Sequence, residues 1–201
     1  MAKILSNLQH TVIAAFVLAA VIAVILMLLG VPAIRMDHAW GAFVFRWLHV
    51  VSGVMWIGLL YYFNFVQMPS MPKIPDEQKP AVSKVIAPQA LFWFRWAAMA
   101  TLVTGLILAL MSNYLWQSYT LGLVDKVDKH AAIGIGMWLG TIMWFNVWFV
   151  IWPNQKIALG IVEADKDAKA KAARTAMLFS RTNTVLSVPM LYAMVSAQNL
   201  Y

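Results

Sequence analysis

A histidine two turns inside a membrane-length apolar stretch is the residue whose type and position most suggest chemistry. His49 belongs to the run Arg46-Trp47-Leu48-His49-Val50-Val51-Ser52-Gly53-Val54-Met55-Trp56-Ile57-Gly58. An ionisable side chain at that depth is costly in hydrocarbon, so it indicates a functional site by default. Imidazole titrates near neutral pH, carries protons and is a common axial ligand of haem iron. His49 is therefore the first candidate ligand.

The residues around His49 suggest a binding face. Arg46, His49, Gly53 and Trp56 recur at spacings of three and four, which places them on one side of a helix. Gly53 leaves room for a flat macrocycle or a closely packed helix, and Arg46 suits a propionate through its planar fork. We hypothesise a b-type haem held between helices, with His49 and His130 as the two axial metal ligands and Arg46, Gly53 and Trp56 beside them.

The depth of the two histidines argues partly against this pair. His49 lies roughly 7 Å from the middle of its apolar segment, and His130 lies roughly 17 Å from the middle of its own. The two helices would then have to be offset by roughly 10 Å, which is demanding for ordinary tilts. His38 or Met137 is an alternative second ligand. Alternatively, His49 binds no cofactor and is hydrogen-bonded to a neighbouring helix.

Three glycines follow His130 at Gly134, Gly136 and Gly140, and the last two form a Gly-x-x-x-Gly step. Small residues most often allow close helix packing in membranes. We therefore interpret these glycines as packing residues.

A second group of polar residues gathers near helix ends on the opposite side of the predicted membrane. The group includes Gln67, Gln155 and Lys156, and aromatic residues lie near it in the sequence. Such a group can bind a planar anion between aromatic walls. Alternatively, arginines at helix ends reach toward headgroups and the aromatics form an interfacial belt. The candidate substrate-binding residues are Asn64, Arg95, Asn146, Asn154, Arg181 and Asn183.

The composition predicts that these residues are positioned by membrane helices. The chain has 201 residues, of which 62% are hydrophobic and only 11% are charged. A soluble domain could not bury that much apolar surface. The net charge of +7 does not indicate nucleic-acid binding, because most Lys and Arg lie in short connections on one side. The absence of Cys excludes disulfides, thiolate metal sites and a covalently attached c-type haem.

Five apolar segments are long enough to span a bilayer, which takes about 20 residues. We expect the first to be a retained helix instead of a cleaved signal. The fifth contains several polar residues and a proline, so it should pack against protein. The connection at 70–85 is predicted to be a loop, and 163–174 to extend a helix into solvent. The predicted spans are 11–31, 41–67, 88–112, 130–153 and 177–197.

The distribution of basic residues sets the expected orientation. Of the 15 Lys and Arg residues, 11 fall on one side of the five spans, which puts that side in the cytoplasm. The chain is thus predicted to be all-α, a single polytopic transmembrane bundle over residues 1–201. Its N-terminus would be cytoplasmic and its C-terminus periplasmic, in the inner membrane of a bacterium.

Five strings of the sequence carry a resemblance to a known family. They are the run from Arg46 to Gly58, Phe92-Trp93-Phe94-Arg95-Trp96, Gly140-Thr141-Ile142-Met143-Trp144-Phe145-Asn146-Val147-Trp148, Ile151-Trp152-Pro153-Asn154-Gln155-Lys156, and Ser180-Arg181-Thr182-Asn183-Thr184. Together they resemble the membrane domain of the cytochrome-c-linked urate oxidase (urate hydroxylase) family. The helix around His49 is more loosely similar to haem-containing membrane protoporphyrinogen oxidases.

The resemblance implies a multi-helix membrane domain, haem-bearing, that passes electrons to a cytochrome c on the outer side. Family members can carry a C-terminal cytochrome c domain. This chain ends at Tyr201 and has no Cys, so it resembles a short form without that domain, and its acceptor is expected to be a separate protein. Urate oxidation by this chain alone does not follow from the resemblance.

Two functions remain open. In the first, the chain is a membrane oxidoreductase: electrons from a small planar substrate or a quinol reach haem b near His49 and leave on the outer face. In the second, it is a non-catalytic helical subunit of a larger membrane complex. The expected partners are the lipid bilayer and either a separate cytochrome c or other membrane subunits, with no nucleic acid. The sequence identifies no catalytic residue.

Overall fold

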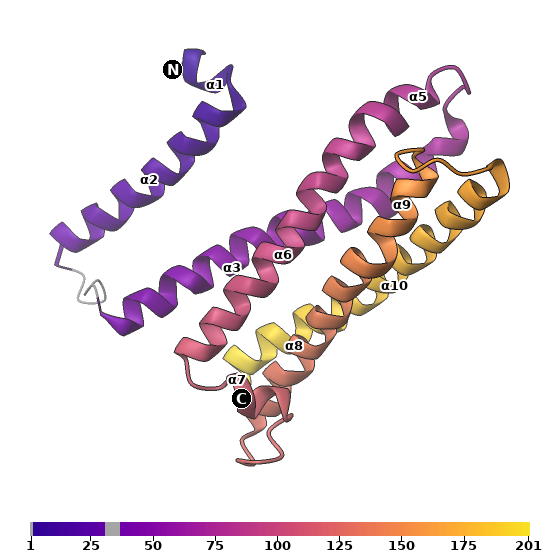
Figure 1. Cartoon of the computed structure of the whole chain (residues 1–201). Coiled ribbons are helices and arrows are strands. Elements are labelled where there is room, and N and C mark those ends of the chain that lie inside the picture. The colour runs from indigo at the N-terminus through magenta and orange to yellow at the C-terminus, as the bar shows by residue number, and fades with distance from the viewer. Residues whose placement is uncertain (1, 31–36) are drawn as a thin grey trace. The chain divides into compact units, whose positions relative to one another are not determined.

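The computed structural model describes residues 2–30 and 37–201, and within these ranges it contains helices and no strand (Figure 1). The chain divides into two compact units, Met1–Val44 and Phe45–Tyr201, which are described separately.

The first unit is dominated by one strongly apolar helix. After the short α1 (Ala2–Leu5), the side chain of Asn7 accepts hydrogen bonds from the backbone N–H groups of Gln9 and His10 and so caps α2 (Leu8–Leu28). No side chain of α2 is buried within the described part of the chain. A helix that is apolar on all sides is typical of a membrane span. The unit also contains the first residues of α3 (His38–Tyr61).

In the second unit, two helices run on well beyond the ends predicted from the sequence. The prediction of a loop at 70–85 is wrong over most of its length, because only 74–78 lacks regular helix. Pro80 lies in the first turn of α5, where its missing N–H costs no hydrogen bond. The elements are α3, η1 (Tyr62–Gln67), α4 (Met68–Ser70), η2 (Met71–Lys73), α5 (Lys79–Ala81), η3 (Val82–Ile86) and α6 (Ala87–Met111).

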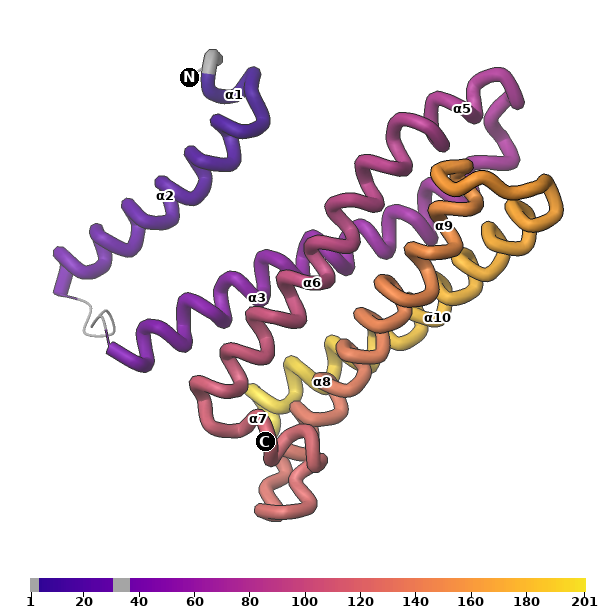
Figure 2. The backbone as a smooth tube through the Cα atoms, in the orientation of Figure 1, coloured from indigo at the N-terminus to yellow at the C-terminus, as the bar shows by residue number. Residues whose placement is uncertain are grey.

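The second half of this unit is a helical hairpin with a short helix packed on its side. The chain continues through α7 (Leu115–Tyr119), α8 (Asp128–Phe145), η4 (Asn146–Ile151), α9 (Trp152–Ala158) and α10 (Lys166–Asn199). Helix α10 runs alongside α8, η4 and α9, as Figure 2 shows, and α7 packs against α8. Asp165 caps α10 by accepting from the N–H of Ala168. The predicted helical extension at 163–174 is therefore confirmed from Lys166 onward.

Four helices of the described residues are long and apolar enough to cross a membrane: Leu8–Leu28, His38–Lys73, Lys79–Met111 and Asp128–Ala158. The predicted all-helical class with several membrane-length helices is thus confirmed. The fifth predicted span lies within α10, which is not among these four. A fifth crossing, the orientation and the single-domain organisation stay predictions.

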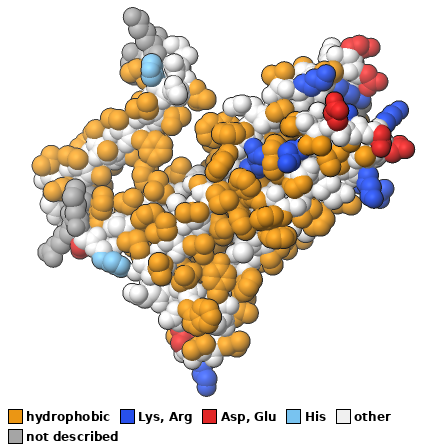
Figure 3. All heavy atoms as spheres, in the orientation of Figure 1, with side chains coloured by type: hydrophobic (Ala, Val, Ile, Leu, Met, Phe, Trp, Pro, Cys, Tyr) orange, Lys and Arg blue, Asp and Glu red, His pale blue; other side chains and the backbone are white. Residues whose placement is uncertain are grey.

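Helix α10 buries a face of small residues, as expected for a helix that packs against protein. That face consists of Ala172, Ala176, Ser180, Asn183, Ser187, Met190, Ala193, Ser196 and Ala197. It packs on a core of larger side chains from the other helices, which includes Trp56, Leu60, Phe63, Leu91, Phe94, Met143, Val147 and Ile151. On the face that Figure 3 draws, most charged side chains of this unit gather at one end, a few lie at the opposite end, and hydrophobic side chains cover most of the surface between them.

Candidate functional site

His49 is held by a backbone carbonyl of the neighbouring helix. Its Nδ1 lies 2.8 Å from the carbonyl oxygen of Thr101 on α6. Because a carbonyl can only accept, Nδ1 carries the hydrogen, and Nε2 of the neutral ring keeps its lone pair. No group of the described residues bonds Nε2. This is the hydrogen bond expected in the alternative in which His49 binds no cofactor. The same arrangement is how proteins commonly orient a metal-binding imidazole, so the ligand hypothesis stays a prediction.

A glycine on α6 makes room for this ring. A Cβ built on Gly105 would lie 2.7 Å from Cε1 and 2.8 Å from Nδ1 of His49, closer than side chains tolerate. From the sequence, we expected the space beside the His49 ring to be provided by Gly53 on α3. A Cβ on Gly53 would instead meet the methyl group of Thr101 at 3.9 Å, so the space beside Gly53 is taken up by α6. Trp56, on the same helix face, is buried.

Gly105→Ala is expected to lower the unfolding temperature and to displace the His49 ring. The added methyl group overlaps the imidazole, and overpacking of this kind costs about 1–3 kcal/mol. Gly58→Ala is the matched control, because nothing lies within 4 Å of its added Cβ. Alanine favours a helix over glycine by about 1 kcal/mol, so the control should be unchanged or more stable. Thermal unfolding in detergent measures both variants, and nitrogen NMR of labelled histidine reports the Nδ1 hydrogen bond. Equal unfolding temperatures would contradict the close packing of ring and glycine.

His130 has different surroundings at the start of α8. Its Nδ1 pairs with a carboxylate oxygen of Asp125, and its ring stacks on Tyr114 with centroids 6.1 Å apart. Burial raises the pKa of Tyr114, and the positive charge of Arg46 acts in the opposite direction. Partial burial works to raise the pKa of Asp125, but the hydrogen bond and charge of His130, with backbone N–H groups, lower it overall. Arg46, Tyr114 and His130 therefore form one neighbourhood.

Within the described residues, no contact joins His49 to His130, so the ligand pair stays a prediction. His49 packs on α6 between Thr101 and Gly105, whereas His130 packs on Tyr114, beyond the end of α6. Tyr114 follows the last residue of α6, Met111, and its backbone N–H donates to the carbonyl of Ala109.

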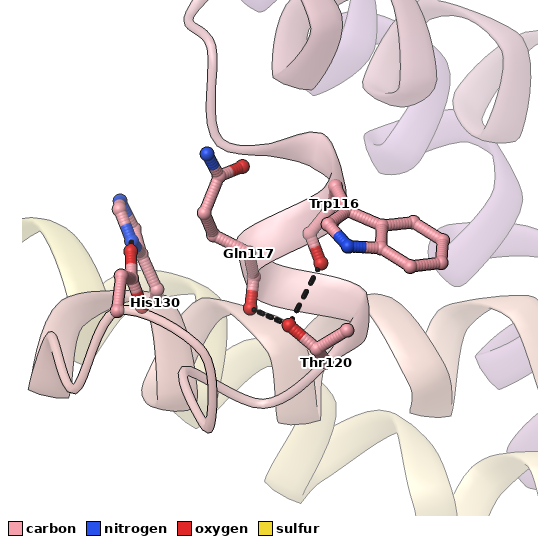
Figure 4. Close-up of polar contacts among 5 residues, drawn as sticks. Trp116, Gln117, Thr120 and His130 are labelled. Atoms are coloured by element: carbon pink, nitrogen blue, oxygen red, sulfur yellow. Dashed lines mark hydrogen bonds and ion pairs between the residues drawn. The ribbon is translucent and has the colours of Figure 1, made fainter.

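Helix α7, which follows Tyr114, was not anticipated from the sequence. It ends where the hydroxyl of Thr120 donates to the carbonyl groups of Trp116 and Gln117, as Figure 4 shows beside His130. A Cβ on Gly134 of α8 would lie 2.0 Å from the carbonyl oxygen of Ser118, so α7 rests directly on this glycine. The packing interpretation is thus confirmed for Gly134. Gly136 likewise packs on α10, against Met194, whereas Gly140 faces open space.

Three of the six predicted substrate-site residues converge on α10. Asn183 is fully buried; its side-chain N–H group donates to the carbonyl of Met143 at 2.9 Å, and its oxygen accepts from Asn146 at 2.8 Å. Asn64 donates to the hydroxyl of Ser180, also on α10, at 2.8 Å. Asn64 lies in the π-helical turn η1 and Asn146 begins the π-helical turn η4. Such turns are rare and are frequently found at functional sites.

The other three predicted residues lie elsewhere. Arg181 is exposed, and Asn154 bonds the carbonyl of Val150 in its own helical segment. Arg95 stacks on Trp152, with its Cζ atom 3.3 Å from the ring centroid. Within the described residues, no hydrogen bond joins any of the three to the buried asparagines.

A cavity of about 160 Å³ lies between η1, α6, α9 and α10, and its lining includes Ser180, which accepts a hydrogen bond from Asn64. Gln67, Gln155 and Ser180 contribute its polar lining, and Phe63 and Leu91 are among its apolar walls. The side-chain oxygens of both glutamines are buried without a hydrogen-bond partner in the described part of the chain, as is that of Asn64. Unpaired buried acceptors are costly, so the cavity is suited to a guest that carries N–H or O–H donors.

Sequence reasoning missed Ser180, Thr101, Gly105 and Tyr114 as members of these sites. Ser180 could have been found from its spacing to Asn183 and Ser187, which puts three polar residues on one face of a helix. No local signal indicates the other three. Among the described residues, no three His, Asp or Glu side chains form a cluster that could hold a metal ion.

Comparison with known proteins finds one similarity. The family model for the urate oxidase N-terminal region matches residues 126–200, which include α8, η4, α9 and α10. The resemblance inferred from the sequence is therefore confirmed over that part of the chain, which contributes Asn146, Ser180 and Asn183. No curated protein and no solved structure matches this chain.

Proposed function

We propose that this chain is a membrane redox protein of the urate oxidase N-terminal type, which binds b-type haem through His49 and passes electrons to an outer-side acceptor. The observation that carries the proposal is the bond from Nδ1 of His49 to the carbonyl of Thr101, which leaves Nε2 free to coordinate iron. The family match over residues 126–200 supports the type of protein.

The described residues supply one candidate axial ligand for the haem iron. His49 would hold the iron, Thr101 would fix the tautomer of its ring, and Arg46, three residues earlier, would pair with a propionate. His130 is engaged with Asp125 and Tyr114, so the second ligand is left open. A bound b-type haem would supply one-electron chemistry by cycling between ferric and ferrous iron.

The cavity beside Asn64 is the proposed position of the electron donor. A small planar substrate or a quinol would offer N–H or O–H donors to the unpartnered oxygens of Gln67 and Gln155, and its flat face to Phe63 and Leu91. Electrons would leave to a cytochrome c on the outer side, and the protein would function in a bacterial inner membrane.

An absorption spectrum of the purified protein tests the haem proposal. After growth with ample haem, the wild type is expected to show a Soret band, and His49→Ala to lose or shift it. His10→Ala is the control, because His10 is an exposed residue of α2 and its loss should leave the band unchanged. The proposal fails if the wild type has no Soret band, or if His49→Ala keeps an unaltered one. Growth on urate as nitrogen source then tests the substrate.

A second candidate function is a non-catalytic helical subunit of a larger membrane complex. The observation that favours it is the open space beside Gly58 and Gly140, which have nothing within 4 Å of an added Cβ. Small residues on open helix faces let another membrane helix approach closely. Absence of haem from a stable, folded wild type would favour this second function.

A further inference from the structure

Two basic side chains from different helices lie against one indole ring. The Cζ atom of Arg95 on α6 is 3.3 Å from the ring centroid of Trp152, and Nζ of Lys156 on α9 is 5.8 Å from the same centroid. A second indole ring also lies near Arg95: the ring centroid of Trp148, on η4, is 5.9 Å from Cζ of Arg95. The aromatic rings stabilise the two cations but offer no acceptor to their N–H groups.

Among the residues that the structure describes, no carboxylate forms an ion pair with Arg95 or Lys156. The ion pairs within residues 2–30 and 37–201 are Lys79 with Asp76 and His130 with Asp125. The Nε atom of Arg95 is buried and has no hydrogen-bond partner in the same ranges. A guanidinium that lies flat on a ring directs its donors outward in its own plane, as a fork that fits two oxygens. The arrangement therefore lacks an anionic acceptor.

The position of the pair indicates where that acceptor comes from. Arg95 precedes Met111, the last residue of α6, by sixteen residues, or roughly 24 Å along the helix. It thus lies close to the far boundary of an apolar bilayer core about 30 Å thick. Phe92, Trp93 and Trp96 around it are exposed, as in the aromatic belts at membrane interfaces.

We propose that Arg95 and Lys156 bind the phosphate of an anionic phospholipid headgroup, with Trp152 as the platform that holds both cations. The net charge of +7 would attract an anionic leaflet to the protein, and basic sites between membrane helices are a known way to bind such headgroups. The proposal goes beyond the redox function and does not depend on it. It removes Arg95 from the set of substrate-binding residues.

Thermal unfolding of delipidated protein in a neutral detergent tests this site. Phosphatidylglycerol is expected to raise the unfolding temperature of the wild type, whereas phosphatidylcholine and inorganic phosphate are not. In the variant Arg95→Gln/Lys156→Gln the apparent affinity for phosphatidylglycerol should fall about ten-fold or more, since charge-assisted bonds are lost. The variant Lys84→Gln/Arg174→Gln removes the same charge from two exposed positions and should respond like the wild type.

Three outcomes would overturn the proposal: an equal response to phosphatidylcholine, the same stabilisation by inorganic phosphate alone, or an unchanged response of the Arg95/Lys156 variant. The single variant Lys156→Gln guards against misfolding, because Lys156 lies near the end of α9 and outside the buried core. If the double variant does not fold, a reduced response to phosphatidylglycerol in Lys156→Gln supports the site, and a full response refutes it.

Discussion

Gly134→Ala is expected to displace α7 from α8 and to lower the unfolding temperature of the protein strongly. A Cβ at this position would lie 2.0 Å from the carbonyl oxygen of Ser118 and 3.0 Å from its carbonyl carbon. Both atoms are backbone, so no side-chain rotation relieves the overlap and α7 must move away from α8. Overpacking in a core costs about 1–3 kcal/mol and sometimes more. We expect the upper end of that range here.

Gly140→Ala provides the matched control on the same helix. Nothing lies within 4 Å of its added Cβ, and alanine favours the helix by about 1 kcal/mol, so this variant should be at least as stable as the wild type. Thermal unfolding compares the two variants, and hydrogen exchange over α7 reports local displacement. Equal stability, with α7 equally protected in both, would mean that α7 does not rest on Gly134.

The helices were largely predictable because hydrocarbon thickness fixes the length of an apolar run. The predicted span at 11–31 corresponds to Leu8–Leu28, and 130–153 lies within Asp128–Ala158. The connection at 70–85 was not predictable in the same way. Its prolines indicate breaks, yet proline in the first turn of a helix removes an N–H that has no partner there. Whether a proline ends a helix or begins one depends on its position in the turn.

The candidate sites were predictable only as far as single helices determine them. His49 is identified by its own apolar surroundings, but Thr101 and Gly105, which fix its ring, belong to a different helix, and only packing brings them together. Arg181 illustrates a second limit. Its neighbour Ser180 and Asn183 belong to the buried face of α10, and Arg181 is rotated by about 100° from Ser180, so it points outward.

Asn183→Leu is expected to lower the free energy of unfolding by about 2 kcal/mol. Leucine has a similar size, so the change mainly removes two hydrogen bonds. It leaves the side-chain N–H group of Asn146 unpaired in the core, whereas the Met143 carbonyl keeps the bond that it accepts from the backbone N–H of Asn146. Each unpaired buried group costs about 1–3 kcal/mol in soluble proteins. Between membrane helices, bonds of this kind average about 0.6 kcal/mol. The expected value lies between these limits because Asn183 is fully buried within protein.

Unfolding in detergent mixtures titrated with sodium dodecyl sulfate measures this free energy, and Asn199→Leu is its control. Asn199 is also on α10, is exposed, and bonds only the Val195 carbonyl of its own helix, so its replacement should change little. A second variant, Asn146→Leu, allows the coupling between Asn146 and Asn183 to be measured. Asn146→Leu removes the side chain that Asn183→Leu leaves without a partner. The double variant should therefore lose less free energy of unfolding than the sum of the two single variants. Strict additivity would show that Asn146 and Asn183 do not depend on each other, and the polar cluster on α10 would then not act as one network.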